Sequence, residues 1–461
     1  MEVVVSGTTV TAIQRAGVVG AGGAGFPSHV KAAASADVVL ANGAECEPLM
    51  RADTELMTLD PKRVVRGLSL VRDSVGAKRA VVALKKKNRL AMDAIAGALP
   101  DDGGIELMPL ANVYPAGDEF LLVFEATGRV VPEGGIPLDV GVVVNNVTTL
   151  AQVADAVEGR PVTDRMVTVQ GEVASPGTFV APIGTSIDEL IEVAGGALEP
   201  AHAVIVGGPM MGHLMEAGGQ PTTKTVAGVI VLPLDHPLVS SMSAREAQVL
   251  RVARAVCCQC MACTELCPRA LLGHGLEPHR TIRAIQYAEF PEDHRHITSA
   301  YLCCECGMGE LFACPLGIQP RRILADLKAE LVRRGVPNPH VRTALSPDDV
   351  REYRQIPVAR LTQRLGLTRY DVDAPLREGR LHPSRVTLQM NQHVGEPAAP
   401  TVKQGQDVLR GDVVGEAAEG SIGARVHASI SGVIESLSAE AVVIAAASAD
   451  GGASEPGGSS P

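Results

Sequence analysis

The chain has 461 residues, which is too many for one hydrophobic core and indicates several domains. Its 41 Lys and Arg residues against 52 Asp and Glu residues leave a formal net charge of -11, which argues against the basic face that nucleic-acid binding needs. No stretch approaches the roughly 18 apolar residues of a membrane span, and MEVVVSGTTVTAIQ at the N-terminus lacks the features of a secretory signal. We therefore expect a cytoplasmic protein without a transmembrane segment.

Residues 1–157 predict an α/β domain, because helix-like and strand-like stretches alternate along them. The helix-like stretches are TVTAIQRAG (9–17) and the amphipathic PKRVVRGLSLVRDSV (61–75). The strand-like stretches are ADVVLAN (36–42), KRAVVALK (78–85) and VGVVVNN (140–146). Lys85-Lys86-Lys87 is interpreted as a solvated strand end.

Residues 162–237 predict a small mixed module. Three β-rich runs, MVTVQGEV, HAVIVGG and AGVIVLP, surround one helix-like segment, SIDELIEVAG. The apolar turn GGPMMG (207–212) is interpreted as packing on the core rather than as a ligand platform.

The second half of the chain divides into a cysteine-rich region at 245–335, a polar connection and a glycine-rich region at 380–447. The cysteine-rich region ends in PRRILADLKAELVRRG (320–335), whose Ile/Leu stripe predicts a helix. Short strands between glycine turns predict a small β barrel-sandwich over 380–447. The last residues, 448–461, have the composition of a disordered tail.

Nine of the ten cysteines lie between residues 257 and 314, which is how metal ligands distribute rather than disulfides. The run Cys257-x2-Cys260-x2-Cys263-x3-Cys267-Pro matches the bacterial ferredoxin pattern, in which three thiolates hold one cubane and the fourth reaches a second cluster. Zinc is the alternative, but four cysteines this closely spaced exceed the pairwise spacing of zinc ribbons. We therefore predict iron–sulfur clusters.

The second cysteine run is irregular, because Gly309 stands where the third cysteine would belong. By the crossed ligation of ferredoxins, the first [4Fe-4S] cluster takes four thiolates, and the second is one short. Three outcomes are open: Cys304 or a non-cysteine group completes the site, a three-iron cluster forms, or the second cluster is absent. We predict an incomplete or labile second cluster. The predicted ligands are Cys257, Cys260, Cys263 and Cys314 for the first cluster and Cys267, Cys303 and Cys306 for the second.

The glycine loop Gly20–Gly25, followed by Phe26 and Lys31, offers main-chain N–H groups that can approach a phosphate. Taken alone, such a glycine-rich loop is as typical of a tight turn as of a phosphate-binding site. Three polar segments follow strand-like runs or turns: NGAECEP (42–48), YPAGDE (114–119) and NNV (145–147). Ligands of α/β proteins generally lie at the ends of strands, so these segments together indicate a binding site.

These segments, with NNVTTL, resemble the FMN- and NADH-binding domain of the flavin-carrying subunit of respiratory complex I and of its counterpart in the Rnf complex, RnfC. Residues 162–237 resemble the soluble-ligand-binding β-grasp insert of those proteins, and residues 245–445 resemble their α-helical dicluster ferredoxin and barrel-sandwich parts. With the barrel-sandwich last, the domain order is similar to that of the cobalamin reductases of propanediol-utilising bacterial microcompartments.

The resemblance implies FMN, [4Fe-4S] clusters and NADH as electron donor. Ala44 departs from it, because complex I-type proteins place an acidic flavin contact there. By position, the implied FMN contacts are Gly20, Gly22, Lys31, Asn42, Glu45, Tyr114, Gly117, Asp118, Asn145 and Asn146. The implied nicotinamide nucleotide contacts are Gly23, Phe26, Glu47 and Glu119, with both glutamates as catalytic residues.

The implied activity is that of an NADH-dependent oxidoreductase that reduces a corrinoid for a B12-dependent enzyme, inside a microcompartment and with shell or adenosyltransferase partners. One alternative is an Rnf-like NADH:ferredoxin or flavodoxin module. Another is a non-catalytic electron-conducting or shell-docking protein, which a failure to bind flavin would favour. The sequence does not fix the terminal acceptor, the choice between NADH and NADPH, or the oligomeric state.

Overall fold

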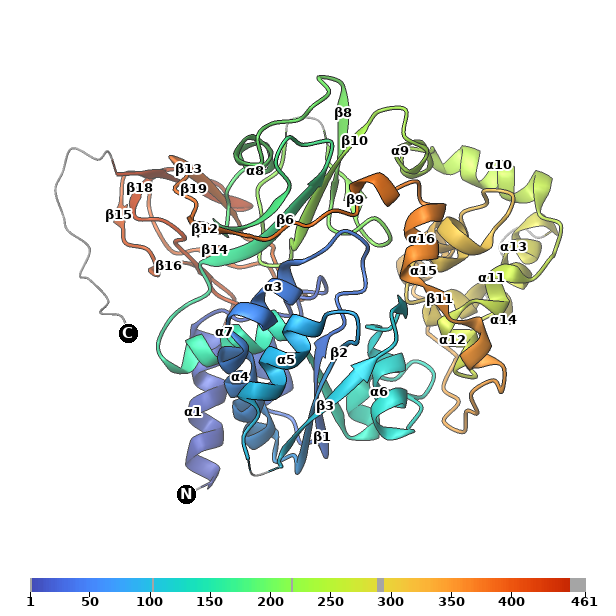
Figure 1. Ribbon diagram of the computed structural model, residues 1–461, viewed down its shortest axis with the longest axis horizontal. Helices are drawn as coiled ribbons and strands as arrows, with labels where there is room; N and C mark the ends of the chain where they lie inside the picture. Colours follow the sequence, from blue (N-terminus) through green and yellow to red (C-terminus); the bar gives the residue numbers. More distant parts are fainter. Residues whose placement is uncertain (1, 102, 217–218, 288–293, 448–461) are drawn as a thin grey trace.

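The computed structural model describes residues 2–101, 103–216, 219–287 and 294–447, which form the four predicted parts of a multidomain α/β protein (Figure 1). The predicted disordered tail, 448–461, lies outside the described residues. Within them, no helix is both long and apolar enough to cross a membrane. The fold class is confirmed, whereas the boundaries between the parts stay predictions.

The first part is built on a four-stranded parallel sheet in the order β3-β2-β1-β5. Its apolar strands are covered on both faces, as parallel sheets require. Sequence reasoning missed β3, because Pro109 weakens a strand pattern; β3 is an edge strand, where proline is tolerated. The strands are β1 (Val38–Gly43), β2 (Arg79–Lys85), β3 (Ile105–Leu110) and β5 (Val142–Asn146).

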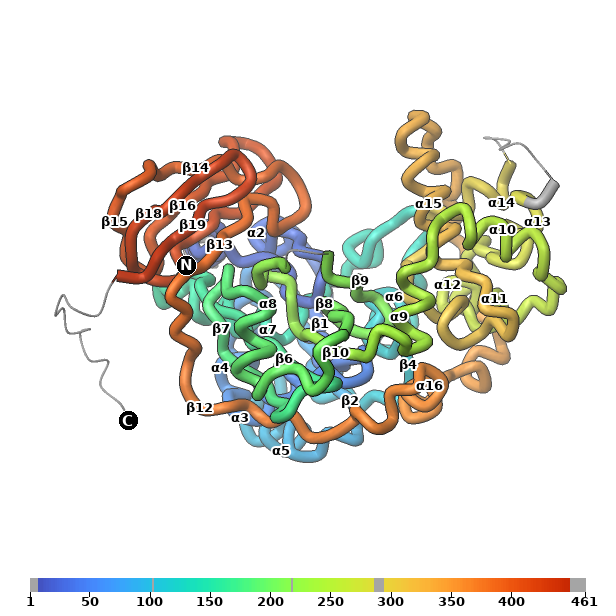
Figure 2. The backbone as a smooth tube through the Cα atoms, turned by 90° about the horizontal axis from the view of Figure 1, so that it is seen from above, coloured from blue at the N-terminus to red at the C-terminus, as the bar shows by residue number. Residues whose placement is uncertain are grey.

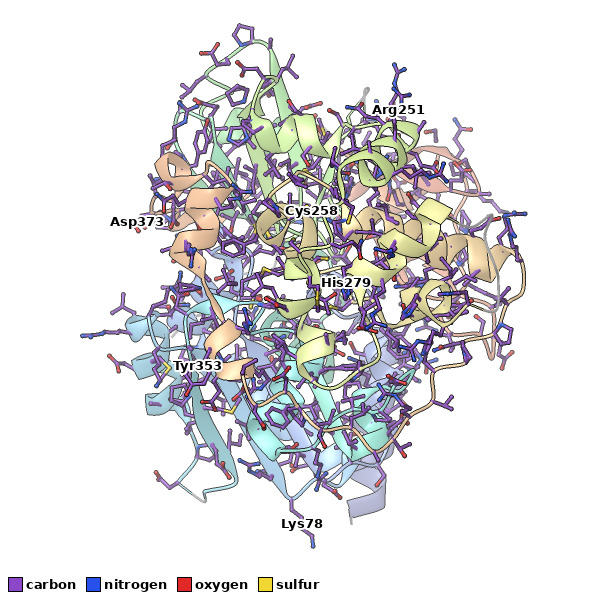
Figure 3. The ribbon with its side chains drawn as sticks, turned by 90° about the vertical axis from the view of Figure 1, so that its right-hand side faces the viewer. Lys78, Arg251, Cys258, His279, Tyr353 and Asp373 are labelled. Atoms are coloured by element: carbon purple, nitrogen blue, oxygen red, sulfur yellow. The ribbon has the colours of Figure 1, made fainter. Side chains whose placement is uncertain are left out.

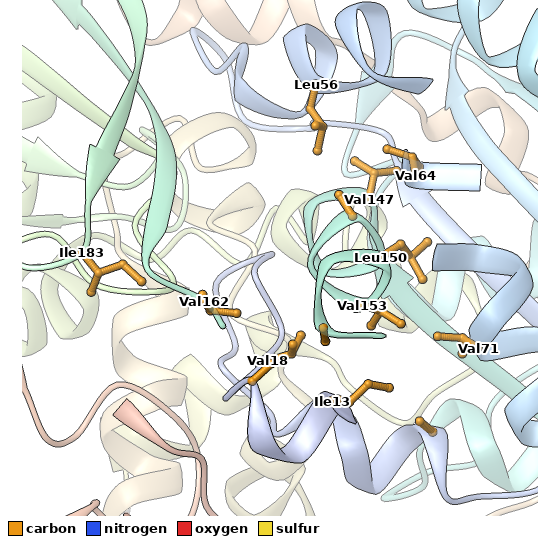
Figure 4. Close-up of a cluster of buried hydrophobic side chains, with 14 of the residues drawn as sticks. Ile13, Val18, Leu56, Val64, Val71, Val147, Leu150, Val153, Val162 and Ile183 are labelled. Atoms are coloured by element: carbon orange, nitrogen blue, oxygen red, sulfur yellow. The ribbon is translucent and has the colours of Figure 1, made fainter. Parts of the chain in front are cut away.

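Helix α4 shows how sequence pattern becomes packing in this part. The predicted helix at 61–75 is confirmed as Pro61–Val75: Asp60 caps its first turn, and Gly76 ends it in the left-handed conformation. Its apolar stripe packs on α7 (Val147–Val157), where a Cβ on Gly67 would lie 1.8 Å from the Leu150 carbonyl oxygen. Figure 4 shows Val64, Val71 and Leu150 in this core.

The remaining helices of the first part surround the sheet. They are α1 (Glu2–Arg15), α2 (Ser28–Ala32), α3 (Ala52–Leu59), α5 (Arg89–Ala98) and α6 (Glu119–Thr127).

The second part is a six-stranded mixed sheet in the order β12-β7-β6-β10-β8-β9, covered by α8 (Ile187–Val193). Its helix falls where SIDELIEVAG predicts one. The strands are β6 (Asp164–Gly171), β7 (Gly177–Pro182), β8 (His202–Val206), β9 (His213–Leu214), β10 (Gly228–Pro233) and β12 (Leu376–Arg380).

The described cysteine-rich region is helical, and its last helix confirms the prediction at 320–335. Short helices alternate with the loops that carry the cysteines. The helices are α9 (Pro237–Met242), α10 (Glu246–Val256), α11 (Ala262–Glu265), α12 (Pro268–Leu271), α13 (Pro278–Tyr287), α14 (Arg295–Thr298) and α15 (Pro320–Arg333), with a π-helical turn at Gly309–Ala313.

The connection after α15 links three parts of the protein through strand pairing. Strand β11 (Ile356–Pro357) pairs with β4 (Val113–Tyr114) of the first part. After α16 (Val358–Arg364), β12 pairs with β7 of the second part. The chain therefore adds strands to two earlier parts before it enters the barrel-sandwich.

The C-terminal barrel-sandwich lies at the opposite end of the molecule from the cysteine-rich region (Figure 2). Its core is continuous with that of the first part in one cluster of buried residues that includes Val162 and Ile183, and Figure 4 shows Val162 beside Val18. Its strands are β13 (Arg385–Gln389), β14 (Ala399–Pro400), β15 (Asp407–Val408), β16 (Val413–Glu416), β17 (Val426–His427), β18 (Gly432–Leu437) and β19 (Ala441–Ala446).

Candidate functional site

Two of the predicted polar segments meet at the carboxyl ends of the parallel sheet. Strand β1 ends at Asn42–Gly43 and β5 at Asn145–Asn146, and the strands are paired so that Asn42 faces Asn146. The Asn42 amide donates to the Gly117 carbonyl oxygen at 2.9 Å, which brings the YPAGDE segment to the same edge. This edge is where α/β folds place ligands.

The glycine loop closes beside these asparagines. The Gly20 N–H donates to the Phe26 carbonyl oxygen at 2.9 Å, while Gly22 and Gly23 are exposed. A Cβ on Gly22 would lie 3.4 Å from the Asn146 Cβ, and Gly23 has a φ of 111°, which L side chains rarely adopt. The loop therefore presents bare main chain toward the strand ends, which fits a phosphate group.

Charged and unpaired polar groups complete this edge. The Lys31 ammonium donates to the Val144 carbonyl oxygen at 2.9 Å and lies 3.5 Å from the Glu119 carboxylate. The buried Asn145 Nδ2 has no hydrogen-bond partner among the described residues, although buried donors are normally paired. An orphaned donor beside a cation and a glycine loop fits FMN, whose phosphate and ring carbonyls accept hydrogen bonds. Phe26 and Glu119 are both half-buried, and the Glu119 side chain is 46% exposed at the rim.

Glu45 turns its carboxylate toward α3 rather than toward the glycine loop. Its oxygens accept from the Asp53 N–H at 2.8 Å and from the Thr54 N–H at 3.1 Å, at the positive N-terminal end of the helix. Burial, then the charge of Asp53, raises the pKa of Glu45 to about 7. A flavin contact by Glu45 stays a prediction.

Glu47 contacts the second part of the protein. Its Oε2 accepts from the Met210 N–H at 2.8 Å, while its buried Oε1 has no partner in the described part of the chain. Burial raises the pKa of Glu47 to about 7. A Cβ on Gly208 would lie 2.3 Å from this carboxylate, so any larger residue there would displace the Glu47 side chain from this position.

The turn at 207–212 also contacts the cysteine-rich region. Met210 is fully buried, as its interpretation as a packing turn predicts, and the Arg321 guanidinium donates to its carbonyl oxygen at 2.8 Å. The turn thus lies between Glu47 and α15. Sequence reasoning did not find this junction, because both contacts use main-chain atoms.

Tyr114 and Asp118 contact the cysteine-rich region directly. The Tyr114 hydroxyl donates to the Cys306 carbonyl oxygen at 2.6 Å. The Asp118 carboxylate binds both terminal nitrogens of Arg269, at 2.6 and 2.9 Å, and also caps α6. Both residues therefore belong to an interface, and their predicted flavin contacts stay predictions.

The first cysteine group, Cys257, Cys260, Cys263 and Cys314, gathers around Cys263. Burial, then the three other thiols and Cys267, raises the pKa of Cys263 to about 12. Cys260 is exposed and so is Cys258, which Figure 3 labels on the face formed by this region.

The second cysteine group is Cys267, Cys303, Cys304 and Cys306. With Cys263, these residues line one cavity. Cys304 and Cys306 are hydrogen-bonded to each other, and this bond lowers the pKa of Cys304. The group therefore has four thiols although position 309 is glycine.

Cys258 and Cys304 occupy equivalent places in two similar loops, CCQC and CCEC. Each loop turns through a residue of positive φ, Gln259 at 58° and Glu305 at 56°. Nevertheless, Cys304 lines the cavity and Cys258 is exposed. The structure thus distinguishes two residues that are locally alike in sequence.

The donor chemistry fits iron–sulfur clusters. Each group offers four sulfur atoms, as a [4Fe-4S] cluster requires. In the described ranges, no three His, Cys, Asp or Glu side chains meet closely enough to hold a single ion, and a cubane spreads its four thiolates over separate irons.

The structure departs from the sequence analysis at two charged residues of the site. Lys85 is 1% exposed, so its interpretation as solvated is wrong; it ends β2, and its ammonium donates to the Glu45 carbonyl oxygen at 3.5 Å. Arg269 was not predicted, and its only sequence signal is its place two residues after Cys267.

The fold and the site define a flavin and iron–sulfur oxidoreductase. Residues 13–155 match the Nuo51 FMN-binding domain, 166–214 the SLBB domain, 256–319 the 4Fe-4S dicluster domain and 372–450 the RnfC barrel sandwich hybrid domain. FMN and iron–sulfur clusters are therefore its cofactors, and NADH fits the Nuo51 family as donor.

The chain belongs to the cobalamin reductase PduS family. It is 46% identical over 434 residues to cobalamin reductase PduS of Salmonella typhimurium, covering 94% of this chain and 95% of the relative. It is 44% identical to PduS of Citrobacter freundii over the same shares. It is 36% identical to a component of the Na(+)-translocating ferredoxin:NAD(+) oxidoreductase complex of Acetobacterium woodii, over 56% of each chain.

Proposed function

We propose that this protein is an NADH-dependent corrinoid reductase that serves a B12-dependent enzyme. The observation that carries the proposal is the 46% identity to a cobalamin reductase over 94% of this chain and 95% of the relative. The junctions between the flavin-binding part and the cysteine-rich region support it, because they bring the electron-donating flavin side into contact with the electron-accepting cysteine side within one chain.

Bound FMN would accept two electrons from NADH and release them singly, which is the chemistry that the cofactor supplies. The chain's own residues hold and orient it. The glycine loop and Lys31 would hold the phosphate, and the Asn145 amide would donate to the ring. Glu119 at the rim and the carboxylate of Glu47 would orient the nicotinamide nucleotide.

The electron route would run from the flavin edge to the second cysteine group and then to the first. Tyr114 contacts the second group at Cys306, and Asp118 contacts it through Arg269. The first group lies nearer the surface, since Cys260 is exposed and Cys267 buried. We assign Cys304 as the fourth ligand of the second cluster, because it lines the cavity with the other three thiols.

The test is anaerobic purification followed by quantitation of flavin, iron and sulfide, and then addition of NADH and cob(III)alamin in sequence. About one FMN and eight irons per chain, bleaching by NADH and subsequent corrinoid reduction would support the proposal. Flavin that NADH does not reduce, or reduced protein that leaves the corrinoid oxidised, would contradict it. NADPH in parallel would establish the donor.

The Rnf-like activity is the second candidate, because 56% of the chain matches a component of a ferredoxin:NAD(+) oxidoreductase complex at 36% identity. Ferredoxin or flavodoxin offered in place of the corrinoid separates the two. Faster reduction of ferredoxin than of cob(III)alamin by the same NADH-reduced protein would favour the Rnf-like activity.

We also propose a location inside a bacterial microcompartment, with a shell protein or an adenosyltransferase as partner. Support comes from the similarity to PduS. Co-purification of the tagged full chain with intact shells from its own host tests the location, and its recovery only in the shell-free fraction would contradict it.

A further inference from the structure

Arg269 is a buried cation beside the second cysteine group. It lies in α12, directly after Cys267 and Pro268, and is 6% exposed. The main-chain N–H groups of Arg269 and Ala270 donate to the Cys267 sulfur. Its guanidinium is also close enough to Cys304 to act on that thiol electrostatically.

The guanidinium is held in place from the opposite side by α6 of the flavin-binding part. Both its terminal nitrogens bind the Asp118 carboxylate, and its Cζ lies over the Phe120 ring, 3.9 Å from the ring centroid. Such a bidentate, stacked arrangement leaves the group little freedom. A guanidinium keeps its charge in folded proteins, and the ion pair with the Asp118 carboxylate at 2.6 Å holds that charge in this position.

A fixed positive charge beside a cluster stabilises the reduced form, because reduction adds one electron and no compensating charge. Asp118 partly cancels this effect, because its charge acts on Cys304 in the opposite sense, but less strongly than the charge of Arg269. The cluster that faces the flavin would thus receive electrons more readily than its thiolate ligands alone would allow.

We propose that Arg269, held by Asp118, is a positioning residue that raises the reduction potential of the second cluster and makes it the acceptor of electrons from the flavin side. This inference rests on the cluster assignment under the proposed function. The step is a one-electron transfer from NADH-reduced flavin to the cluster, and no covalent bond is formed or broken.

The test is an anaerobic redox titration of the full-length, cluster-loaded protein, followed by electron paramagnetic resonance. Dithionite is the reductant, so the result does not depend on NADH or corrinoid turnover. In Arg269→Gln the equilibrium of the second cluster should shift at least tenfold toward the oxidised form, about 59 mV for a one-electron couple. The first cluster is the internal reference and should not move.

Arg269→Lys retains the charge and should restore most of the shift, and Asp118→Asn should move the second cluster in the opposite direction. The matched control is Arg351→Gln, because Arg351 binds Glu125 of α6 at 2.7 Å and stacks on Phe124 at 4.7 Å. It should leave both potentials unchanged. A Cys303→Ser variant should lose the second cluster, so the electron paramagnetic resonance signal that disappears in it belongs to that cluster.

An unchanged second cluster in Arg269→Gln, or an equal shift of both clusters, would overturn the inference. So would a wild-type protein with a single cluster. If Arg269→Gln does not assemble the cluster, Asp118→Asn decides: an upward shift supports the inference and no shift overturns it. A protein that passes this test but leaves corrinoid oxidised would contradict only the proposed function.

Discussion

The Glu47 carboxylate accepts a hydrogen bond from the Met210 N–H at 2.8 Å and so joins the flavin-binding part to the SLBB part. Met210 belongs to a cluster of buried residues that also contains Tyr114 and Met308. This cluster links three parts of the chain at the point where the flavin edge meets the cysteines. Glu47 is therefore structural in this state of the protein as well as a predicted nucleotide contact.

Glu47→Gln should remove the loss of folding stability that the Glu47 carboxylate causes as pH rises. Burial raises the pKa of Glu47 from 4.5 to about 7, so between these values the folded state binds more protons than the unfolded state. Stability from this group is therefore lost as pH rises from 4.5 to 7, by roughly 2 kcal/mol after allowance for partial exposure. The variant, which still accepts from Met210, should gain thermal stability relative to the wild type as pH rises.

Thermal midpoints of the loaded protein at pH 5 and pH 7.5 measure this effect. The matched control is Glu378→Gln, which removes a carboxylate from the exposed face of β12. A difference between wild type and Glu47→Gln that is the same at both pH values would contradict the assigned burial cost.

The fold was largely predictable, because α4, β1, β2 and β5 carry uninterrupted local patterns. The cysteine spacing likewise predicted which cysteines gather in two groups, except that it left the place of Cys304 open, and their roles as ligands stay predictions. What local patterns could not supply was orientation: Cys258 and Cys304 stand in nearly identical loops, yet only Cys304 faces a cavity. The contacts of Glu47 and Asp118 with other parts depend on how the parts dock, which no local pattern encodes.

Gly23→Ala should lower flavin content while leaving the fold intact. Gly23 has a φ of 111°, and no atom lies within 4 Å of an added Cβ, so the cost is confined to the loop backbone. Such strain is of order 1–3 kcal/mol and would displace the N–H groups proposed to face the phosphate. Flavin fluorescence released from purified protein measures the loss.

Gly128→Ala is the matched control for the glycine loop, because Gly128 also has a positive φ, 70°, with open space around it, and ends α6. It should cost comparable stability yet retain flavin. Equal flavin loss in both variants would show that general destabilisation, rather than the phosphate loop, is responsible.

Tyr114→Phe should slow electron transfer between flavin and clusters without affecting flavin reduction. The substitution removes the hydrogen bond to the Cys306 carbonyl oxygen, worth about 1 kcal/mol, and loosens the loop that carries this cysteine. Stopped-flow mixing with NADH should show flavin bleaching at the wild-type rate and cluster reduction slowed severalfold. Tyr370→Phe, which removes a hydroxyl bonded to Glu172 at 2.7 Å, is the control. Slower flavin bleaching in Tyr114→Phe would instead place this tyrosine at the nucleotide site.

Cys304→Ser should remove about half of the bound iron, because it takes one thiolate from a group of only four. Cys258→Ser is the matched control and should retain full iron content, since its side chain is exposed.

Gly309→Cys, which would restore the regular ferredoxin spacing, should not raise the iron content of the wild type. A Cβ at this position would lie 3.4 Å from Pro320 and 3.7 Å from the Cys263 Cβ, and Gly309 lines the cavity in which Cys304 already supplies a fourth thiol. The number of clusters in each variant is measured by iron and sulfide analysis, together with the electron paramagnetic resonance spectrum of the reduced protein. If Cys304→Ser keeps all its iron, or Gly309→Cys gains four, then Cys304 is not the fourth ligand, and the second site is one thiolate short, as the spacing alone predicts.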